Sequence, residues 1–169
     1  MTTVSQVMTR GVRSMRPSDN VVAAAQAMEE LNVGVIPVCE GEKLIGMVTD
    51  RDIIVRGVAQ ERDVKTTRLA DVMSTHVRTA HENDDVDKIL SEMAGSQIRR
   101  LPVVDEQERL IGIVSLGDVA AKNPEDQGDV AMSLGDISSP AQPDRSHQSQ
   151  ASGAAGGGSS SGQQRTQPG

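Results

Sequence analysis

Two apolar stripes of helical period occur along the chain, and each follows a short cluster of polar residues. The clusters are Ser18-Asp19-Asn20 and Asn83-Asp84-Asp85, whose side chains can cap the first turn of a helix. Apolar residues three and four positions apart share one helix face, so the spacing predicts two amphipathic helices. The stripes consist of Val21, Val22, Ala25, Met28 and Leu31, and of Val86, Ile89, Leu90 and Met93.

Each predicted helix is followed by two short β-branched segments that flank a polar turn, a pattern typical of a β-hairpin. These segments are residues 33–38 and 44–48 in the first case, and residues 98–104 and 110–114 in the second. Pro37 and Pro102 have no N–H group to donate to a sheet. We therefore expect their strands to lie at an edge or to join the ladder only in part.

Shorter elements complete the pattern on both sides of each hairpin. We expect short helices at residues 4–8 and 69–73, first strands at 12–15 and 77–80, and closing helices at 51–57 and 118–122. The order of elements is then α-β-α-β-β-α, twice. This order predicts the α/β (α+β) fold class.

The two halves are copies of one unit. Residues 7–38 align with residues 72–103 at a shift of 65, and residues 44–53 align with 110–119 at a shift of 66, with fourteen identities. Repetition at a fixed period indicates repeated supersecondary units, here residues 4–66 and 67–122. One unit alone would leave an apolar sheet face uncovered, so we expect the two copies to pack about a pseudo-two-fold axis into one globule.

Residues 123–169 have a different composition. They hold 4 of the Val, Ile, Leu and Met residues, against 41 in residues 1–122, and 28 of these 47 residues are Gly, Pro, Ser or Gln. Such a segment cannot bury enough apolar surface to offset its chain entropy, so we expect a disordered tail. Val130, Met132, Leu134 and Ile137 form its one weak apolar patch, which could dock transiently.

Composition removes several function classes. The chain has no Phe, Tyr or Trp and a net charge of −7, so it lacks stacking platforms for bases and repels phosphate backbones. We expect no nucleic-acid partner. Cys39 is the only cysteine, no signal peptide is evident, and no run of about 20 apolar residues could span a membrane. The expected location is the cytoplasm, with no membrane contact.

One motif recurs at the junction between the second hairpin strand and the closing helix. It reads Gly-x-x-Thr/Ser-x-x-Asp and occurs as residues 46–52 and 112–118. In structural terms Thr49 with Asp52, and Ser115 with Asp118, can form a capping box. In functional terms a helix N-terminus favours anions, and the two aspartates could accept hydrogen bonds from a ribose diol. The sequence leaves both interpretations open.

Three successive motifs of the chain resemble those of cystathionine-β-synthase (CBS) repeats. They are Val-Met-Thr at residues 7–9, Val-Ile-Pro-Val at 35–38 with Arg-Leu-Pro-Val-Val at 100–104, and the closing motifs at 46–53 and 112–119. The chain is similar to small stand-alone bacterial proteins made of one CBS pair. The resemblance implies a Bateman module with two clefts for AMP, ADP, ATP or S-adenosylmethionine as regulatory ligand, and no required cofactor.

The resemblance also implies roles for individual residues. Thr49, Asp52, Ser115 and Asp118 would hold the ribose. The adenine would lie near Val12, Val35, Ile36 and Pro37, or near Val77, Leu101 and Pro102. In related subunits, including the γ subunit of AMP-activated protein kinase, basic residues at the place of Arg99 and Arg100 contact phosphates.

The two clefts should be unequal. Gly34 and Val35 stand where the second copy has Arg99 and Arg100, while Arg51 stands where the second copy has Gly117. We place Arg51, Arg99, Arg100 and Gly117 at the phosphates and expect one cleft to bind nucleotide tightly. Which cleft that is stays open, because phosphates could reach across the pseudo-two-fold axis.

Catalysis and metal binding are not expected. His76, His81 and His147 have no ligand-like spacing with Cys39, and no nucleophile and base can be placed on converging elements. We therefore expect a non-enzymatic, nucleotide-sensing module that forms a homodimer and acts on a regulated protein partner. The alternative is a structural or dimerisation scaffold that has lost ligand binding.

Overall fold

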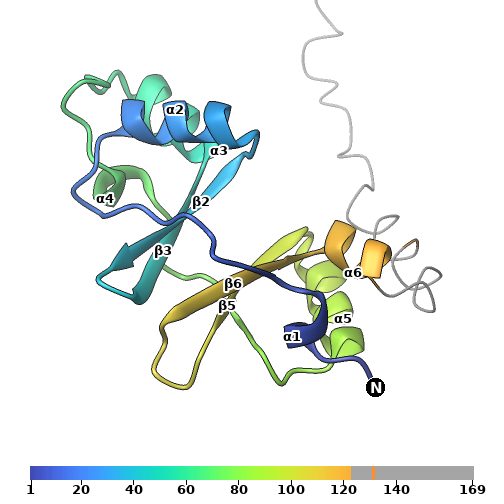
Figure 1. Cartoon of the computed structure of the whole chain (residues 1–169). Coiled ribbons are helices and arrows are strands. Elements are labelled where there is room, and N and C mark those ends of the chain that lie inside the picture. The colour runs from blue at the N-terminus through green and yellow to red at the C-terminus, as the bar shows by residue number, and fades with distance from the viewer. Residues whose placement is uncertain (123–130, 132–169) are drawn as a thin grey trace, which may run out of the picture. The chain divides into compact units, whose positions relative to one another are not determined.

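A computed structural model of the protein describes residues 1–122 and Ala131. The helices are α1 (Val4–Val7), α2 (Val21–Leu31), α3 (Asp50–Asp52), α4 (Leu69–Val72), α5 (Val86–Ser96) and α6 (Leu116–Lys122). A π-helical turn, η1 (Ile53–Gly57), and a 3-10 turn, η2 (Val58–Gln60), follow α3. The strands are β1 (Thr9–Arg10), β2 (Val35–Glu40), β3 (Lys43–Thr49), β4 (Ala80–His81), β5 (Arg100–Val104) and β6 (Leu110–Ser115) (Figure 1). The expected tail, Ala131 apart, lies outside the described residues.

The two long helices begin where the polar clusters predicted them. The Val22 N–H donates to Asn20 Oδ1 over 2.6 Å at the start of α2, and the Asp87 N–H donates to Asp85 Oδ1 over 3.0 Å at the start of α5. Both helices end at a residue in the left-handed region, Asn32 and Gln97. α5 buries its predicted stripe of Val86, Ile89, Leu90 and Met93. α2 buries Val21 and Met28 together with Ala24 and Ala27, whereas Val22, Ala25 and Leu31 of the predicted stripe are exposed. The two helices are therefore present as predicted, but the buried face of α2 was predicted only in part.

Both hairpins are also present. β2 pairs antiparallel with β3 in a two-stranded sheet, and β5 pairs antiparallel with β6 inside a sheet of order β1-β6-β5-β4. β4 runs parallel to β5 and pairs only with Val103 and Val104. Pro102 therefore lies just outside the parallel register, which agrees with a strand that joins its ladder only in part.

The prediction for the first strands was wrong over most of their length. In place of a strand at 12–15, only Met15 forms a bridge, to Val38, and the strand expected at 77–80 is reduced to Ala80–His81. β1 was not predicted: it turns at Gly11, whose φ is +69°, and pairs with β6 of the second copy. A strand of two residues is too short to produce an alternating pattern of apolar and polar residues, and its distant partner strand cannot be recognised from the local sequence.

The short helices are exchanged between the copies. α1 and the residue after it contribute Val4, Val7 and Met8 to a core that otherwise comes from the second copy. The residues of the second copy in this core include Ile89, Leu101 and Val114. α4 likewise contributes Leu69 and Val72 to a core that otherwise comes from the first copy. Figure 1 shows α1 against α5 and α6, apart from the β2–β3 hairpin that follows it in sequence. The two copies are therefore held together by their own chain crossings.

Two basic side chains secure this exchange in the same way. Arg56 donates to the carbonyls of Val72 and Met73, and Lys122 donates to the carbonyls of Val7 and Met8 over 2.7 and 3.2 Å. Arg56 and Lys122 are equivalent positions of the repeat. Each caps the C-terminal end of the short helix that packs on its own copy. In the part of the chain described, no helix has the length and apolarity needed to cross a membrane.

Candidate functional site

The repeated motif forms a capping box in both copies. In the first copy the Thr49 N–H donates to Asp52 Oδ2 and the Asp52 N–H donates to Thr49 Oγ1, both over 3.0 Å. In the second copy the Ser115 N–H donates to Asp118 Oδ2 over 2.9 Å and the Asp118 N–H donates to Ser115 Oγ over 3.1 Å. The structural interpretation of the motif is therefore confirmed, and any ligand role must use the atoms that the caps leave free.

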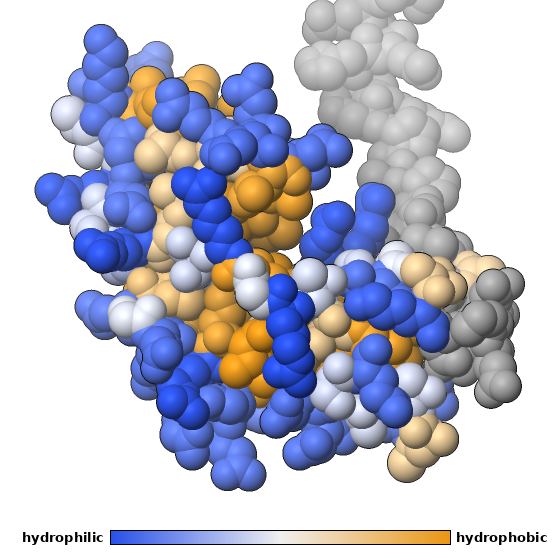
Figure 2. Space-filling model, viewed as in Figure 1, coloured by the Kyte–Doolittle hydropathy of each residue, from blue (hydrophilic) through white to orange (hydrophobic). Residues whose placement is uncertain are grey.

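A cavity of about 430 Å³ lies beside the second motif, and we call it the Asp118 cavity. Ser115 and Asp118 form its polar end, while Val12, Val35 and Ile36 of the first copy form apolar wall. It is also lined by Thr9, Gly11, Arg13, Leu31, Val33, Arg100 and Ile113. Figure 2 shows a hollow, where apolar and polar side chains meet, between the part that carries α2 and the part that carries α6.

A second cavity, of about 320 Å³, lies beside the first motif, and we call it the Thr49 cavity. Val77, Leu101 and Pro102 of the second copy form its apolar wall. It is also lined by Val35, Met47, Ser74, His76, Arg78, Ser96, Ile98 and Arg100. Each cavity thus combines the closing motif of one copy with the apolar wall of the other, and Val35 and Arg100 line both.

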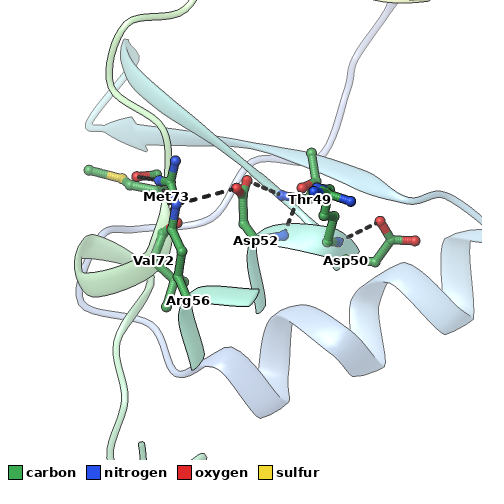
Figure 3. A network of polar contacts seen from close by, with 7 residues as sticks. Thr49, Asp50, Asp52, Arg56, Val72 and Met73 are labelled. Atoms are coloured by element: carbon green, nitrogen blue, oxygen red, sulfur yellow. Dashed lines mark hydrogen bonds and ion pairs between the residues drawn. The ribbon is translucent and has the colours of Figure 1, made fainter. Parts of the chain in front are cut away.

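The two motif aspartates have different surroundings. Asp118 Oδ1 accepts a hydrogen bond from Thr9 Oγ1 over 3.2 Å, and Asp118 lines its cavity. Asp52 Oδ1 instead pairs with Arg56 Nε over 3.8 Å, and Asp52 lines neither of the two cavities. Figure 3 shows Asp52 between Thr49 on one side and Arg56 on the other, with Arg56 reaching on toward Val72 and Met73. Of the two motif aspartates, Asp118 lines one of these two cavities and Asp52 lines neither.

Most of the residues singled out from the sequence line these two cavities. The exceptions are Asp52, Pro37, Arg51, Arg99 and Gly117, which line neither. Pro37 is buried in β2, whereas Arg51, Arg99 and Gly117 are exposed beside the motifs. Among the basic residues expected at phosphates, only Arg100 faces the cavities.

Sequence reasoning missed Thr9, Arg13, His76 and Arg78. Arg13 and Arg78 are equivalent in the repeat, and their identity at a shift of 65 was the available signal. Arg13 follows α1 and β1, and Arg78 follows α4, which are the segments that cross from one copy to the other. Only the fold therefore brings each of these arginines to a cavity wall. Arg13 pairs with Glu30 over 3.1 Å, whereas the described residues offer Arg78 no ion pair or side-chain hydrogen bond.

The described residues contain no group of three or more His, Cys, Asp or Glu side chains that could hold a metal ion. Cys39 is a free, buried thiol. Burial raises the pKa of Cys39, and its hydrogen bond with Ser14 offsets only part of that effect. A thiol with a raised pKa is a poor nucleophile at neutral pH.

Comparison with known proteins identifies the family. The profile of the CBS domain matches residues 4–58 and again residues 69–124. The chain belongs to the CBS domain family. Its two CBS repeats are 45% identical over 120 residues to the CBS domain-containing protein YhcV of Bacillus subtilis, a match that covers 71% of this chain and 84% of YhcV.

Solved CBS structures share the fold and include complexes with adenosyl compounds. The CBS domain pair of protein MJ0100, in complex with 5-methylthioadenosine and S-adenosyl-L-methionine, is 28% identical, with a TM-score of 0.63 over 72% of this chain and 94% of that chain. CBSX2 in complex with AMP is 26% identical, with a TM-score of 0.66 over 75% of this chain and 99% of that chain. The tandem CBS repeats and the mixed α/β fold predicted from the sequence are therefore confirmed.

Proposed function

We propose that this CBS pair is a regulatory module that binds an adenosyl ligand in the Asp118 cavity. The observation that carries the proposal is the position of Asp118, a carboxylate at the end of a cavity whose wall is made of Val12, Val35 and Ile36. A polar group that converges with an apolar wall is the usual composition of a small-molecule site. The size of about 430 Å³ lies within the range of such sites.

The hydrogen bonds already made by Asp118 define what it can offer. Its Oδ2 atom accepts from the Ser115 N–H and, over 2.6 Å, from the Ser115 hydroxyl, while Oδ1 accepts only from Thr9 among the contacts of the described residues. A carboxylate has about four acceptor positions, so Oδ1 retains capacity for a further donor. In this proposal a ribose hydroxyl supplies that donor.

The rest of the ligand finds matching groups on the same walls. An adenine ring lies against Val12, Val35 and Ile36, which replace the aromatic platforms that this sequence lacks. The ligand's phosphates extend toward Arg13 and Arg100, and the positive charge of these residues supports AMP, ADP or ATP over the cationic sulfonium of S-adenosylmethionine. The Asp118 cavity is then the tight site that the unequal sequences predicted, and Asp52, held by Arg56, is not given a ribose role here.

Calorimetric titration of the full chain with AMP, ADP, ATP and S-adenosylmethionine tests the proposal. Asp118→Asn preserves an acceptor for the cap but removes the charge, and we expect AMP affinity to fall at least about tenfold. The matched control is Asp52→Asn, which we expect to change AMP affinity by less than about twofold. Equal effects of the two substitutions, with unchanged melting temperatures, would place the nucleotide elsewhere.

The alternative is a scaffold that has lost ligand binding. It is favoured for the Thr49 cavity by the ion pair that draws Asp52 toward Arg56. If calorimetry detects no binding heat with any of the four ligands at millimolar concentration, the scaffold alternative holds for the whole chain. We propose a homodimer under both hypotheses, the ligand-binding module and the scaffold. Exposed apolar side chains on η1 and η2 support this proposal. We also propose that the module acts on a regulated protein partner in the cytoplasm and that it is not an enzyme.

A further inference from the structure

We infer that the Thr49 cavity is an anion site for a phosphate-bearing ligand and not a second nucleoside site. The inference concerns the cavity next to the proposed nucleoside site. Arg100 lines both cavities, so the test uses Arg78, which lines the Thr49 cavity and not the Asp118 cavity. It depends on three differences between cavities that the repeat makes equivalent: the unpaired Arg78, the missing carboxylate, and the hydrogen-bonding side chains of His76 and Ser96.

The first difference is the state of the cations. Arg78, Arg100 and His76 line the Thr49 cavity, and none of its lining residues is acidic. Within the described residues, the guanidinium groups of Arg78 and Arg100 make no ion pair or hydrogen bond. Arg13, at the equivalent place in the Asp118 cavity, is already paired with Glu30 over 3.1 Å. Two unpaired guanidinium groups offer bidentate hydrogen bonds to phosphate oxygens.

The second difference is the carboxylate. Asp118 faces its own cavity, but Asp52 is fixed by the Thr49 N–H over 3.0 Å and by Arg56 over 3.8 Å, outside the lining of the Thr49 cavity (Figure 3). A carboxylate at the wall would repel a phosphate and attract a ribose diol. Its displacement favours the anion and removes the group that would select the nucleoside.

The third difference lies in the neutral donors. Relative to the Asp118 cavity, the repeat places His76 where Gly11 stands and Ser96 where Leu31 stands. Thr49 Oγ1 accepts from the Asp52 N–H, which leaves its hydroxyl hydrogen for a ligand. These changes convert apolar or empty positions into hydrogen-bond donors, which strengthen binding of an anion when they converge with cations.

The size of the Thr49 cavity is compatible with a compact anion. The Thr49 cavity measures about 320 Å³, smaller than the Asp118 cavity at about 430 Å³. A diphosphate group has enough oxygens to bond with Arg78 and Arg100 at the same time. A site with a single guanidinium group would bind other small anions as well and would not select a diphosphate. The ligand class is thus a pyrophosphate or a small phosphorylated metabolite.

The test is a calorimetric titration of the full chain with sodium pyrophosphate at a constant ionic strength of about 0.1 M. We expect saturable binding that Arg78→Gln weakens at least about tenfold. Arg13→Gln is the matched control, because it removes the equivalent cation from the other cavity, and we expect it to change pyrophosphate affinity by less than about twofold. Melting curves of both variants verify that each is folded.

Further titrations separate this inference from the proposed nucleoside site. Asp118→Asn should leave pyrophosphate binding unchanged even where it abolishes AMP binding, and adenosine, which has no phosphate, should not displace pyrophosphate. Absence of saturable pyrophosphate binding, equal losses in Arg13→Gln and Arg78→Gln, or displacement by adenosine would each overturn the inference. Failure of AMP alone to bind would reject the nucleoside site and leave the anion site standing.

Discussion

At the scale of single residues, the glycine of each closing motif serves the crossing between the two copies. A Cβ on Gly112 would lie 2.6 Å from the Thr9 carbonyl oxygen and 3.1 Å from Met8 Sδ. A Cβ on Gly46 would lie 2.8 Å from the Ser74 carbonyl oxygen. The neighbouring backbone cannot retreat without breaking the pairing of Thr9 with Ile113. The glycine therefore lets the crossing segments reach the cavity walls.

Substitution of Gly112 tests this role. We expect Gly112→Ala to lower the free energy of unfolding by about 1–3 kcal/mol, because the added methyl group meets backbone and not a flexible side chain. Urea denaturation measures the change. Gly95→Ala is the matched control: no atom lies within 4 Å of its added Cβ, it is exposed on α5, and we expect a gain of about 0.5–1 kcal/mol. A Gly112→Ala variant as stable as the wild type would contradict the steric account.

The cap residues were predictable and the cavity residues only in part. Thr49, Asp52, Ser115 and Asp118 form a local pattern, and the capping box that it predicts needs no distant partner. Asp52 and Asp118 differ in their surroundings because Asp52 pairs with Arg56, whereas Asp118 accepts a hydrogen bond from Thr9. Thr9 reaches Asp118 across 109 positions of sequence, and no local pattern reports such a contact.

At the scale of elements, the turn before α5 joins three parts of the chain through Asp84. Its Oδ2 accepts from the His81 N–H over 2.8 Å, its Oδ1 accepts from Lys88 Nζ over 3.4 Å, and its carbonyl accepts from the Val4 N–H of α1 over 2.9 Å. Burial alone would raise the pKa of Asp84, but the hydrogen bonds from His81 and Lys88 and the charge of Lys88 outweigh it. The pKa of Asp84 therefore lies below its ordinary value.

This lowered pKa predicts a pH dependence of stability. The ionised Asp84 stabilises the fold fully above the unfolded-state pKa of about 3.9, and the contribution is lost as the pH falls through the lower folded-state pKa. We expect Asp84→Asn to be less stable than the wild type by about 0.5–1 kcal/mol at pH 7, with the difference shrinking below about pH 4. Thermal melts from pH 7 to acid pH measure it.

A partial variant separates the contributions. Lys88→Gln removes the ammonium group and leaves the hydrogen bond from the His81 N–H to Asp84. We therefore expect it to lower the stability at pH 7 by less than Asp84→Asn does. A difference between wild type and Asp84→Asn that stays constant from neutral to acid pH would mean that the Asp84 charge contributes nothing.

Elements with a local signal were found from the sequence, and elements without one were not. α2 and α5 carry a helical period and their own caps, so Val21 and Val86 were placed correctly as first residues. The strand expected at 12–15 failed because Met15 alone contacts β2 there. Exchange of α1 and α4 was also not predictable, because Val7 and Val72 are apolar in either arrangement and only the chain path decides which core receives them.

At the scale of the whole molecule, the turns η1 and η2 expose three apolar side chains that lie within five residues of one another. Ile54 is 57% exposed, Val58 50% and Val55 43%, all on the turns η1 and η2. A groove of about 300 Å³, lined by Ala25, Met28 and Ile53 among others, adjoins Ile54. Clustered apolar side chains at a surface mark an interaction site. In the proposed homodimer this surface faces a second copy of the chain.

Light scattering coupled to size exclusion tests the dimer directly. We expect the wild type to elute with a mass twice the 17.9 kDa of one chain. Ile54→Asp should weaken association at least about tenfold, because an unpaired carboxylate would be buried at the centre of the interface. Gln60→Glu, a charge added to a polar exposed position of η2, is the control and should leave the mass unchanged. A wild type that stays monomeric, or an Ile54→Asp variant that dimerises as well as Gln60→Glu, would show that these turns do not form the interface.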